Sequence, residues 1–121
     1  MIVLDTTVLI DLLRGHAPAR TYLTSLDETP ACSEVSRVEL LRGVRAPERT
    51  GAERLMRALR WISLDEEIAR RAGILGRAWR RSHALTTPDL VIAATAEGLD
   101  ARLATSNVRH FPMFEGLEPP Y

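Results

Sequence analysis

Three acidic residues, well separated in this sequence, are candidates for binding a metal ion. Asp5 directly follows the apolar residues Ile2–Leu4, Glu39 lies in "SRVELLRGV", and Asp89 lies in "TPDLVIAATAEG". Carboxylates that lie close together repel one another and raise one another's pKa, and a divalent cation removes that repulsion. Oxygen ligands without His or Cys suit a hard ion. The three acids therefore predict a Mg²⁺ or Mn²⁺ site, provided that the fold brings them together.

The elements that would carry these side chains follow from the hydrophobic pattern. Short apolar runs predict strands at residues 2–5, 30–33, 61–64 and 101–105, with one last strand near Leu117. Amphipathic stretches predict helices at residues 6–15, 17–27, 36–44, 47–60, 65–83 and 87–98. Short apolar strands separated by helices indicate a mostly parallel sheet that is covered on both faces. The predicted fold class is therefore α/β, a three-layer α/β/α sandwich in which residues 1–121 form a single domain.

All three acids are predicted at the same edge of that sheet. Asp5 ends the first strand, Glu39 lies in the first turn of the helix after the second strand, and Asp89 is the second residue of the last helix. Asn107 follows the last of the four main strands. In an open parallel sheet, the carboxyl ends of strands and the amino ends of helices share one edge, where ligands bind. Four separate segments thus deliver polar side chains to one place.

Each acid also has a structural interpretation that stays open. Asp5 could cap the helix that follows it, and Ser36 with Glu39 matches the S-x-x-E capping box. Asp89 could simply interact with the dipole of a helix that has Thr87 as its cap. Three independent structural roles would then all have to fall on one edge of the sheet. That coincidence favours the metal site.

The composition and the charge of the chain exclude several classes of function. The 16 basic and 16 acidic residues give a formal net charge of zero, which does not by itself indicate a nucleic-acid binder. All the basic residues are Arg, so mechanisms that need a lysine, such as a Walker phosphate site or a Schiff base, are excluded. The histidines show no zinc-ligand spacing with one another or with Cys32, the single cysteine. One cysteine, no signal-peptide pattern and no apolar run of about 20 residues predict a cytoplasmic protein that does not enter a membrane.

Three segments of the sequence together resemble a known family. The segments are "VLDTTVLIDLLRG", "SEVSRVELLRGV" and "TTPDLVIAATAEGLDARLATSNVRHF". In this order and at this chain length they resemble the PIN domain, and most closely the VapC-type toxins of bacterial toxin–antitoxin pairs. The resemblance implies a Mg²⁺- or Mn²⁺-dependent endoribonuclease that inhibits translation by cleaving RNA. It also implies a VapB-type antitoxin as partner and a homodimer.

The resemblance assigns residues as well as a function. Asp5, Glu39 and Asp89 match the catalytic, metal-binding acids of the family. Asn107 falls near a fourth position that is often Asp, and an amide there would hold a second metal less firmly. Four hydroxyl residues resemble a set that supports the site: Thr6, Thr7, Thr105 and Ser106.

Several arginines near the predicted edge are candidates for contact with RNA phosphates. They are Arg14, Arg37, Arg42 and Arg109, and a solvated helix surface explains each of them as well. His110, which follows Arg109, is expected to fix a loop. Apolar stripes at Val8–Leu13, Val38–Val44 and Leu55–Leu59 fit either a homodimer interface or the core.

Three other function classes stay open on the sequence alone. A phosphotransfer enzyme or receiver-like domain also places acids at a parallel-sheet edge, although this chain lacks its lysine and its acid two residues after Asp5. A metal-dependent nuclease outside a toxin–antitoxin system, acting on DNA, would use the same acids. A degenerate PIN domain would act only as a binding module, and Asn107 is the residue that favours this alternative.

Overall fold

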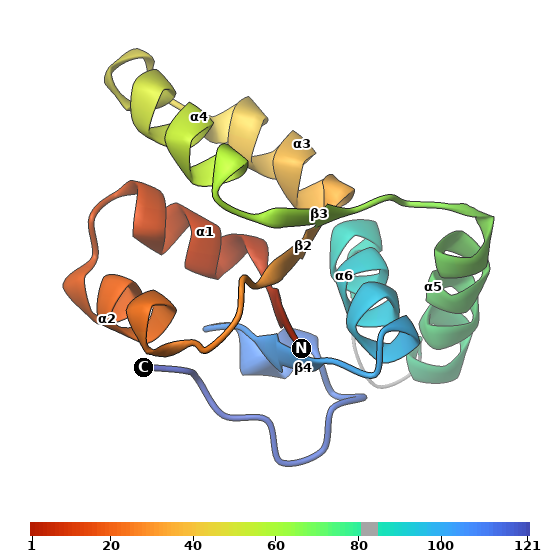
Figure 1. Ribbon diagram of the computed structural model, residues 1–121. Coiled ribbons are helices and arrows are strands. Elements are labelled where there is room, and N and C mark those ends of the chain that lie inside the picture. The colour runs from red at the N-terminus through yellow and green to blue at the C-terminus, as the bar shows by residue number, and fades with distance from the viewer. Residues whose placement is uncertain (81–84) are drawn as a thin grey trace.

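One parallel sheet forms the centre of the computed structural model, which describes residues 1–80 and 85–121 (Figure 1). The strands are β1 (Ile2–Leu4), β2 (Ala31–Ser33), β3 (Arg60–Ile62) and β4 (Arg102–Ala104), in the order β3-β2-β1-β4. The α-helices are α1 (Thr6–Leu13), α2 (Ala17–Ser25), α3 (Glu34–Gly43), α4 (Arg49–Arg57), α5 (Glu66–Trp79) and α6 (Thr87–Gly98). Two 3₁₀ helices are η1 (Ala46–Glu48) and η2 (Val108–His110). Among the described residues, no helix is long and apolar enough to span a bilayer.

The side chains of β1 alternate between two apolar cores. Ile2 and Leu4 pack with residues of α1, α2 and α4 on one face of the sheet. Val3 packs with residues of α5 and α6 on the other face, as the alternation of side chains along a strand requires. Figure 1 shows α1 and α2 on one side of the sheet and α5 and α6 on the other. The predicted three-layer α/β/α sandwich is confirmed, and every strand pair in it is parallel.

The strand order places a topological switch point beside β1. From β1 the chain continues to β2 and β3 on one side, whereas β4 pairs with the other side of β1. In open parallel sheets, ligands bind in the crevice outside the carboxyl ends of the strands at such a point. Asp5 follows β1 and Thr105 follows β4, so these two residues flank the crevice.

The start of α3 differs from the prediction. Ser33 caps this helix, and its hydroxyl accepts a hydrogen bond from the backbone N–H of Val35 at 3.1 Å. The helix therefore begins at Glu34, and the predicted start at Ser36 is wrong. Ser36 is fully buried inside the helix. Glu39 consequently lies in the second turn rather than the first.

The start of α6 also differs from the prediction by one residue. Thr86, not Thr87, is the cap, and its hydroxyl accepts the backbone N–H of Asp89 at 3.3 Å. Asp89 is therefore the third residue of the helix rather than the second. It still lies in the first turn, where the helix dipole favours a negative charge.

Three further boundaries differ from the predictions. The helix expected over residues 47–60 is divided into η1 and α4. The strand expected near Leu117 is not formed in the described tail, where two consecutive prolines at 119 and 120 remove the backbone donors that a strand needs. The helix expected over residues 65–83 is α5, which ends at Trp79, and positions 81–83 of that prediction lie outside the described residues.

Candidate active site

Asp5 is a buried carboxylate at the junction of β1 and α1, with 3% of its surface exposed. Its Oδ2 accepts hydrogen bonds from the hydroxyl of Thr7 at 2.8 Å and from that of Thr105 at 2.7 Å. The second bond joins the carboxyl ends of β1 and β4, which are a hundred residues apart in sequence. Asp5 occupies the N-cap position of α1 but makes no side-chain cap bond there. Helix capping therefore does not explain this carboxylate.

Opposing effects act on the ionisation of Asp5. Burial removes water from the charged form and raises the pKa of Asp5 above its usual value of 3.8, and the charge of Asp89 raises it further. Hydrogen bonds from Thr105, from Thr7 and from the backbone of Thr6 lower the pKa without cancelling the rise. The ionised form is thus electrostatically unfavourable in the folded protein. A cation beside it would relieve this cost.

Glu39 approaches the same region from α3. The hydroxyl of Thr6 donates a hydrogen bond to Glu39 Oε1 at 2.7 Å and lies 2.9 Å from the hydroxyl of Ser36. These contacts fix the first residue of α1 against α3. Because Ser33 caps α3, Glu39 lies too far along the helix to complete a capping box. The capping-box interpretation of Ser36 and Glu39 is wrong.

Asp89 comes from the first turn of α6 and has a histidine as its partner. Its Oδ2 lies 3.1 Å from Nδ1 of His110. The Asp89 side chain is 16% exposed and that of His110 is 51% exposed, so the pair lies at the mouth of the site. His110 does fix a loop, as expected, but it also contacts one of the three acids. This contact could not be predicted from the sequence, because the two residues are 21 positions apart and belong to different elements.

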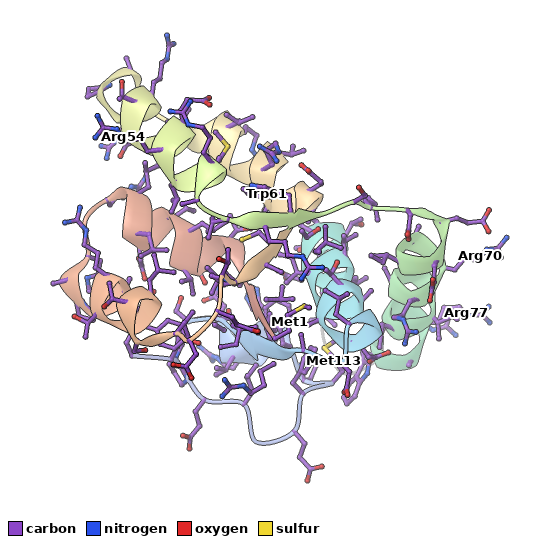
Figure 2. All side chains as sticks on the ribbon, in the orientation of Figure 1. Met1, Arg54, Trp61, Arg70, Arg77 and Met113 are labelled. Carbon is purple, nitrogen blue, oxygen red and sulfur yellow. The ribbon has the colours of Figure 1, made fainter. Side chains whose placement is uncertain are left out.

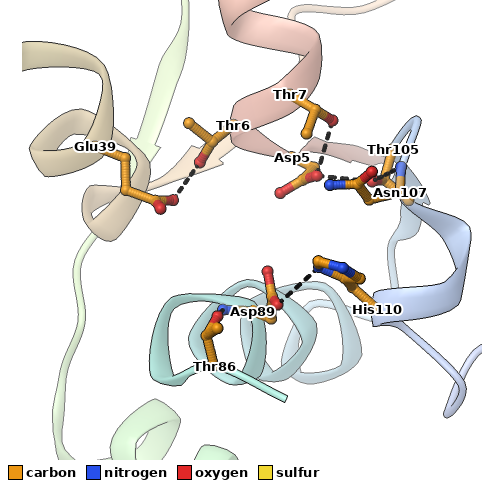
Figure 3. A network of polar contacts seen from close by, with 9 residues as sticks. All are labelled: Asp5, Thr6, Thr7, Glu39, Thr86, Asp89, Thr105, Asn107 and His110. Carbon is orange, nitrogen blue, oxygen red and sulfur yellow. Dashed lines mark hydrogen bonds and ion pairs between the residues drawn. The ribbon is translucent and has the colours of Figure 1, made fainter. Parts of the chain in front are cut away.

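The segment after β4 supports the site through both side chains and backbone. Thr105 is fully buried, and its hydroxyl accepts the backbone N–H of Asn107 at 2.9 Å while it donates to Asp5. The backbone N–H of Ser106 donates to the hydroxyl of Thr7 at 3.3 Å. Thr6, Thr7 and Thr105 thus contact Asp5 or Glu39 through their hydroxyls, whereas Ser106 contributes its backbone. Asn107 lies beside Asp5 (Figure 3).

Figure 3 shows Asp5, Glu39 and Asp89 turned toward one another from the starts of α1 and α6 and from α3. Within residues 1–80 and 85–121, no three Asp, Glu, His or Cys side chains are close enough to ligate one ion together. Each of the three acids has a protein hydrogen-bond partner of its own instead. The donor atoms of the three acids are all oxygens, and this set fits Mg²⁺ or Mn²⁺ by its chemistry. It does not fit zinc, which takes nitrogen and sulfur ligands in most sites.

The predicted RNA-contacting arginines occupy different parts of the molecule. Arg109 is exposed and directly precedes His110, so it lies next to the site. Arg14 follows the last residue of α1, at the opposite end of that helix from the site, and lies 3.8 Å from Glu48. Contact of Arg109 with RNA stays a prediction. The position of Arg14 gives no support to a role at the carboxylates.

Two more of these arginines belong to α3. Arg37 pairs with Glu34 at 2.5 Å, and its guanidinium lies 4.1 Å from the centre of the Trp61 ring. The contact with Trp61 links α3 to β3 and gives Arg37 a structural role. Arg42 is exposed in the last turn of α3.

Comparison with known proteins adds independent information. A family model described as "PIN domain" matches residues 2–114. Ribonuclease VapC19 of Mycobacterium tuberculosis (strain ATCC 25618 / H37Rv) is 46% identical over 125 residues, which cover 100% of both chains. Ribonuclease VapC10 of the same strain is 48% identical over 124 residues, which cover 100% of this chain and 93% of the relative. A solved toxin–antitoxin complex from Klebsiella pneumoniae is similar with a TM-score of 0.82 and 27% identity, over 100% of this chain and 98% of that one.

These similarities agree with the fold and with the resemblance inferred from the sequence. The family match extends over nearly the whole chain, and so do the two relatives at 46% and 48% identity. The parallel sheet has its acids at the carboxyl edge, where the sequence predicted them. The chain therefore belongs to the PIN domain family and, within it, to the VapC group.

Proposed function

We propose that this protein is a Mg²⁺- or Mn²⁺-dependent endoribonuclease, the toxin of a toxin–antitoxin pair, which inhibits translation by cleaving RNA. The main support is the arrangement of Asp5, Glu39 and Asp89, which three separate segments turn toward one another at a topological switch point. The relatives at 46% and 48% identity carry the name ribonuclease. Asn107 is the residue that favours the binding-module alternative, whereas the name ribonuclease carried by relatives at 46% and 48% identity favours the nuclease.

The roles of the acids follow from their surroundings. Asp5, Glu39 and Asp89 would hold the cation in part through the water molecules that Mg²⁺ usually keeps, because no three of the described acids are close enough to bind one ion directly. When bound, the cation would lower the pKa of a water molecule and polarise the phosphodiester. Thr7 and Thr105 stabilise the ionised form of Asp5 by donating to it. The threonine at position 6 orients Glu39 in the same way. These hydrogen bonds favour the ionised carboxylates of Asp5 and Glu39, the form that binds a cation.

The residues around the acids have supporting roles. His110 contacts Oδ2 of Asp89 and thereby restricts the orientation of that carboxylate. Arg109, exposed and adjacent, would contact a phosphate of the substrate. Asn107 is neutral, so the site would hold one cation firmly and a second one less firmly.

The partner proposed for this chain is a VapB-type antitoxin that covers the site. The support is the similarity to the solved toxin–antitoxin complex from Klebsiella pneumoniae. A homodimer is proposed as well, through α3. Val8–Leu13 and Leu55–Leu59 contribute to the core, whereas Val38 and Leu41 of α3 are 63% and 46% exposed.

Cleavage by the purified chain tests the ribonuclease proposal. RNA and DNA of the same sequence are incubated with the protein and Mg²⁺, with and without a chelator. We expect RNA cleavage that the chelator stops, and loss of cleavage in Asp5→Asn and in Asp89→Asn. Asp27→Asn is the matched control, because Asp27 is exposed and precedes the amino end of β2, whereas the site lies at the carboxyl edge of the sheet. The proposal is wrong if folded Asp5→Asn protein cleaves RNA at the rate of the parent protein.

A further inference from the structure

Positive charge is concentrated in one part of this neutral chain. Residues 42–60 run from the last turn of α3 through α4 to the first residue of β3. They contain six Arg and two Glu, a formal charge of +4, so the rest of the chain carries −4. In Figure 1, α3 and α4 lie side by side at one corner of the molecule. Although the net charge of the chain is zero, residues 42–60 form a basic region.

Most of the arginines in this region have no acidic partner. Of the six, Arg45 pairs with Glu48 at 2.9 Å. The other five are exposed and have no ion pair within the described part of the chain: Arg42, Arg49, Arg54, Arg57 and Arg60. Their charge is therefore available to an external ligand.

Helix α5, on the other face of the sheet, shows how arginines are neutralised elsewhere in this protein. Arg70 pairs with Glu66, four residues before it, at 3.3 Å. Arg71 pairs with Glu97 of α6 at 3.0 Å. Pairs of this kind are typical of a solvated helix surface. α4 has three Arg and only one acid, Glu53, so the same explanation does not cover it.

Two arginines of α4 lie on its outer side and a third lies near its buried side. Ala52 and Met56, one turn apart, are buried against the core. With 3.6 residues per turn, Arg54 and Arg57 lie about 180° and 120° around the helix from this buried pair. Arg49 lies only about 40° from the pair but is exposed in the first turn, and Glu53 lies between Arg49 and Arg57. Figure 2 shows Arg54 on the outer side of α4.

This surface is separate from the carboxylate site. Helix α4 packs against the end of α1 that lies away from the site. Gly51 of α4 faces Leu13, the last residue of α1, and a Cβ atom at position 51 would lie 3.6 Å from the Leu13 side chain. Asp5 precedes the first residue of the same helix. A helix of eight residues, as α1 is, spans about 12 Å. The arginines of α4 therefore do not neutralise the three acids.

We propose that α4, through Arg54 and Arg57 on its outer side and the exposed Arg49 in its first turn, binds the phosphate backbone of RNA and retains the substrate while the acids act on it. This inference rests on the proposed ribonuclease function. The acidic site repels phosphates, so an RNA substrate requires positive charge elsewhere on the protein. The planar guanidinium group of Arg binds phosphate through two parallel hydrogen bonds.

Salt-dependent RNA binding tests this surface. The triple variant Arg49→Gln, Arg54→Gln and Arg57→Gln removes the charges of α4, and Gln has a helix propensity close to that of Arg. The control variant Arg20→Gln, Arg77→Gln and Arg102→Gln removes three exposed, unpaired charges elsewhere in the described residues. Both sets are made in the Asp5→Asn protein, which is expected to bind RNA without cleaving it. Affinity for a fluorescein-labelled single-stranded RNA is measured by anisotropy at several salt concentrations.

The α4 variant is expected to bind more weakly than the control variant. Each lost phosphate contact reduces the slope of log K against log salt by about 0.7, so three contacts reduce it by about 2. In the protein with Asp5 restored, the α4 substitutions are also expected to raise KM for the same RNA. Equal affinities and equal slopes for the two triple variants would overturn the proposal, because only net charge would then matter.

The two proposals fail in different ways. If the α4 arginines govern RNA binding but the parent protein releases no cleavage products with Mg²⁺, the ribonuclease proposal is wrong and the binding surface stands. If the parent protein cleaves RNA and the α4 variant binds and cleaves like the control, the ribonuclease proposal stands and the surface is refuted.

Discussion

Thr105→Val removes the hydrogen bond that joins the carboxyl ends of β1 and β4. Valine has nearly the same shape as threonine, so the substitution removes a hydroxyl without opening a cavity. Thr105 is fully buried and Asp5 is 3% exposed, so water cannot replace the 2.7 Å bond. A hydrogen bond to a charged group contributes about 1.5–3 kcal/mol. We therefore expect the free energy of unfolding at neutral pH to fall by about 2–3 kcal/mol.

Urea unfolding followed by circular dichroism measures this loss, and Thr105→Ser is its control. Serine keeps the hydroxyl and loses one methyl group, which costs about 1 kcal/mol in a core. Each kcal/mol changes the melting temperature of a chain of this size by about 3–5 °C. Valine should therefore lower the Tm by roughly 10 °C, and serine by less than half of that.

A double-mutant cycle with Asp5→Asn tests whether charge is the cause. With a neutral amide at position 5, Thr105→Val should cost about 1–2 kcal/mol less than it does with Asp, because a bond between neutral groups contributes only about 1 kcal/mol. The bond that the Thr105 hydroxyl accepts from the backbone N–H of Asn107 is lost in both backgrounds. The coupling energy between the two positions should then be about 1–2 kcal/mol. If Thr105→Val costs the same with Asp or Asn at position 5, or no more than Thr105→Ser, the reasoning about this bond is wrong.

Three further predictions concern stability and ion binding. Because burial raises the pKa of Asp5 in the folded state, stability is lost as the pH rises through that pKa, by about 1.4 kcal/mol for each unit of the rise. Asp5→Asn should therefore unfold at higher urea concentration than the parent protein at neutral pH, and this advantage should disappear below pH 3.8. His110→Ala should weaken Mn²⁺ binding by about tenfold in calorimetry, and His110→Asn should restore part of it because an amide N–H can replace Nδ1 beside Asp89. Ser33→Ala should cost about 1 kcal/mol in urea unfolding, because Ser33 caps α3.

The sequence predicted the architecture because the strands are short and apolar on both faces. Val3 and Leu4 face different cores, so the first strand has no polar residue until Asp5 ends it. The general rule for parallel sheets then placed the carboxyl end of every strand at one edge. Nothing beyond this pattern was needed to bring Asp5, Glu39 and Asp89 to the same side of the molecule.

The contacts that organise the site could not be predicted in the same way. In "SEVSRVE", Ser33 and Ser36 are both possible helix caps, and local sequence does not distinguish them. A tertiary contact determines which serine is the cap. The Ser36 hydroxyl lies 2.9 Å from the hydroxyl of Thr6 inside the protein, so Ser33 caps the helix. The bond from Thr105 to Asp5 likewise depends on the pairing of β4 with β1.

Tertiary partners also compete with local ones. Glu67 and Arg71 have the spacing of a favourable pair on one helix. In the structure Arg71 pairs with Glu97 of α6 instead, at 3.0 Å. Glu66 and Arg70, which have the same spacing, pair with each other at 3.3 Å.

Ion binding by the folded protein is the most direct measurement of the central claim, which is that Asp5, Glu39 and Asp89 share a divalent cation. Calorimetric titration of Mn²⁺ into the parent protein should show saturable binding that Mg²⁺ competes for. This binding should be lost in Asp5→Asn and retained in Asp27→Asn. Absence of Mn²⁺ and Mg²⁺ uptake by the parent protein, or equal uptake by folded Asp5→Asn, would contradict the claim.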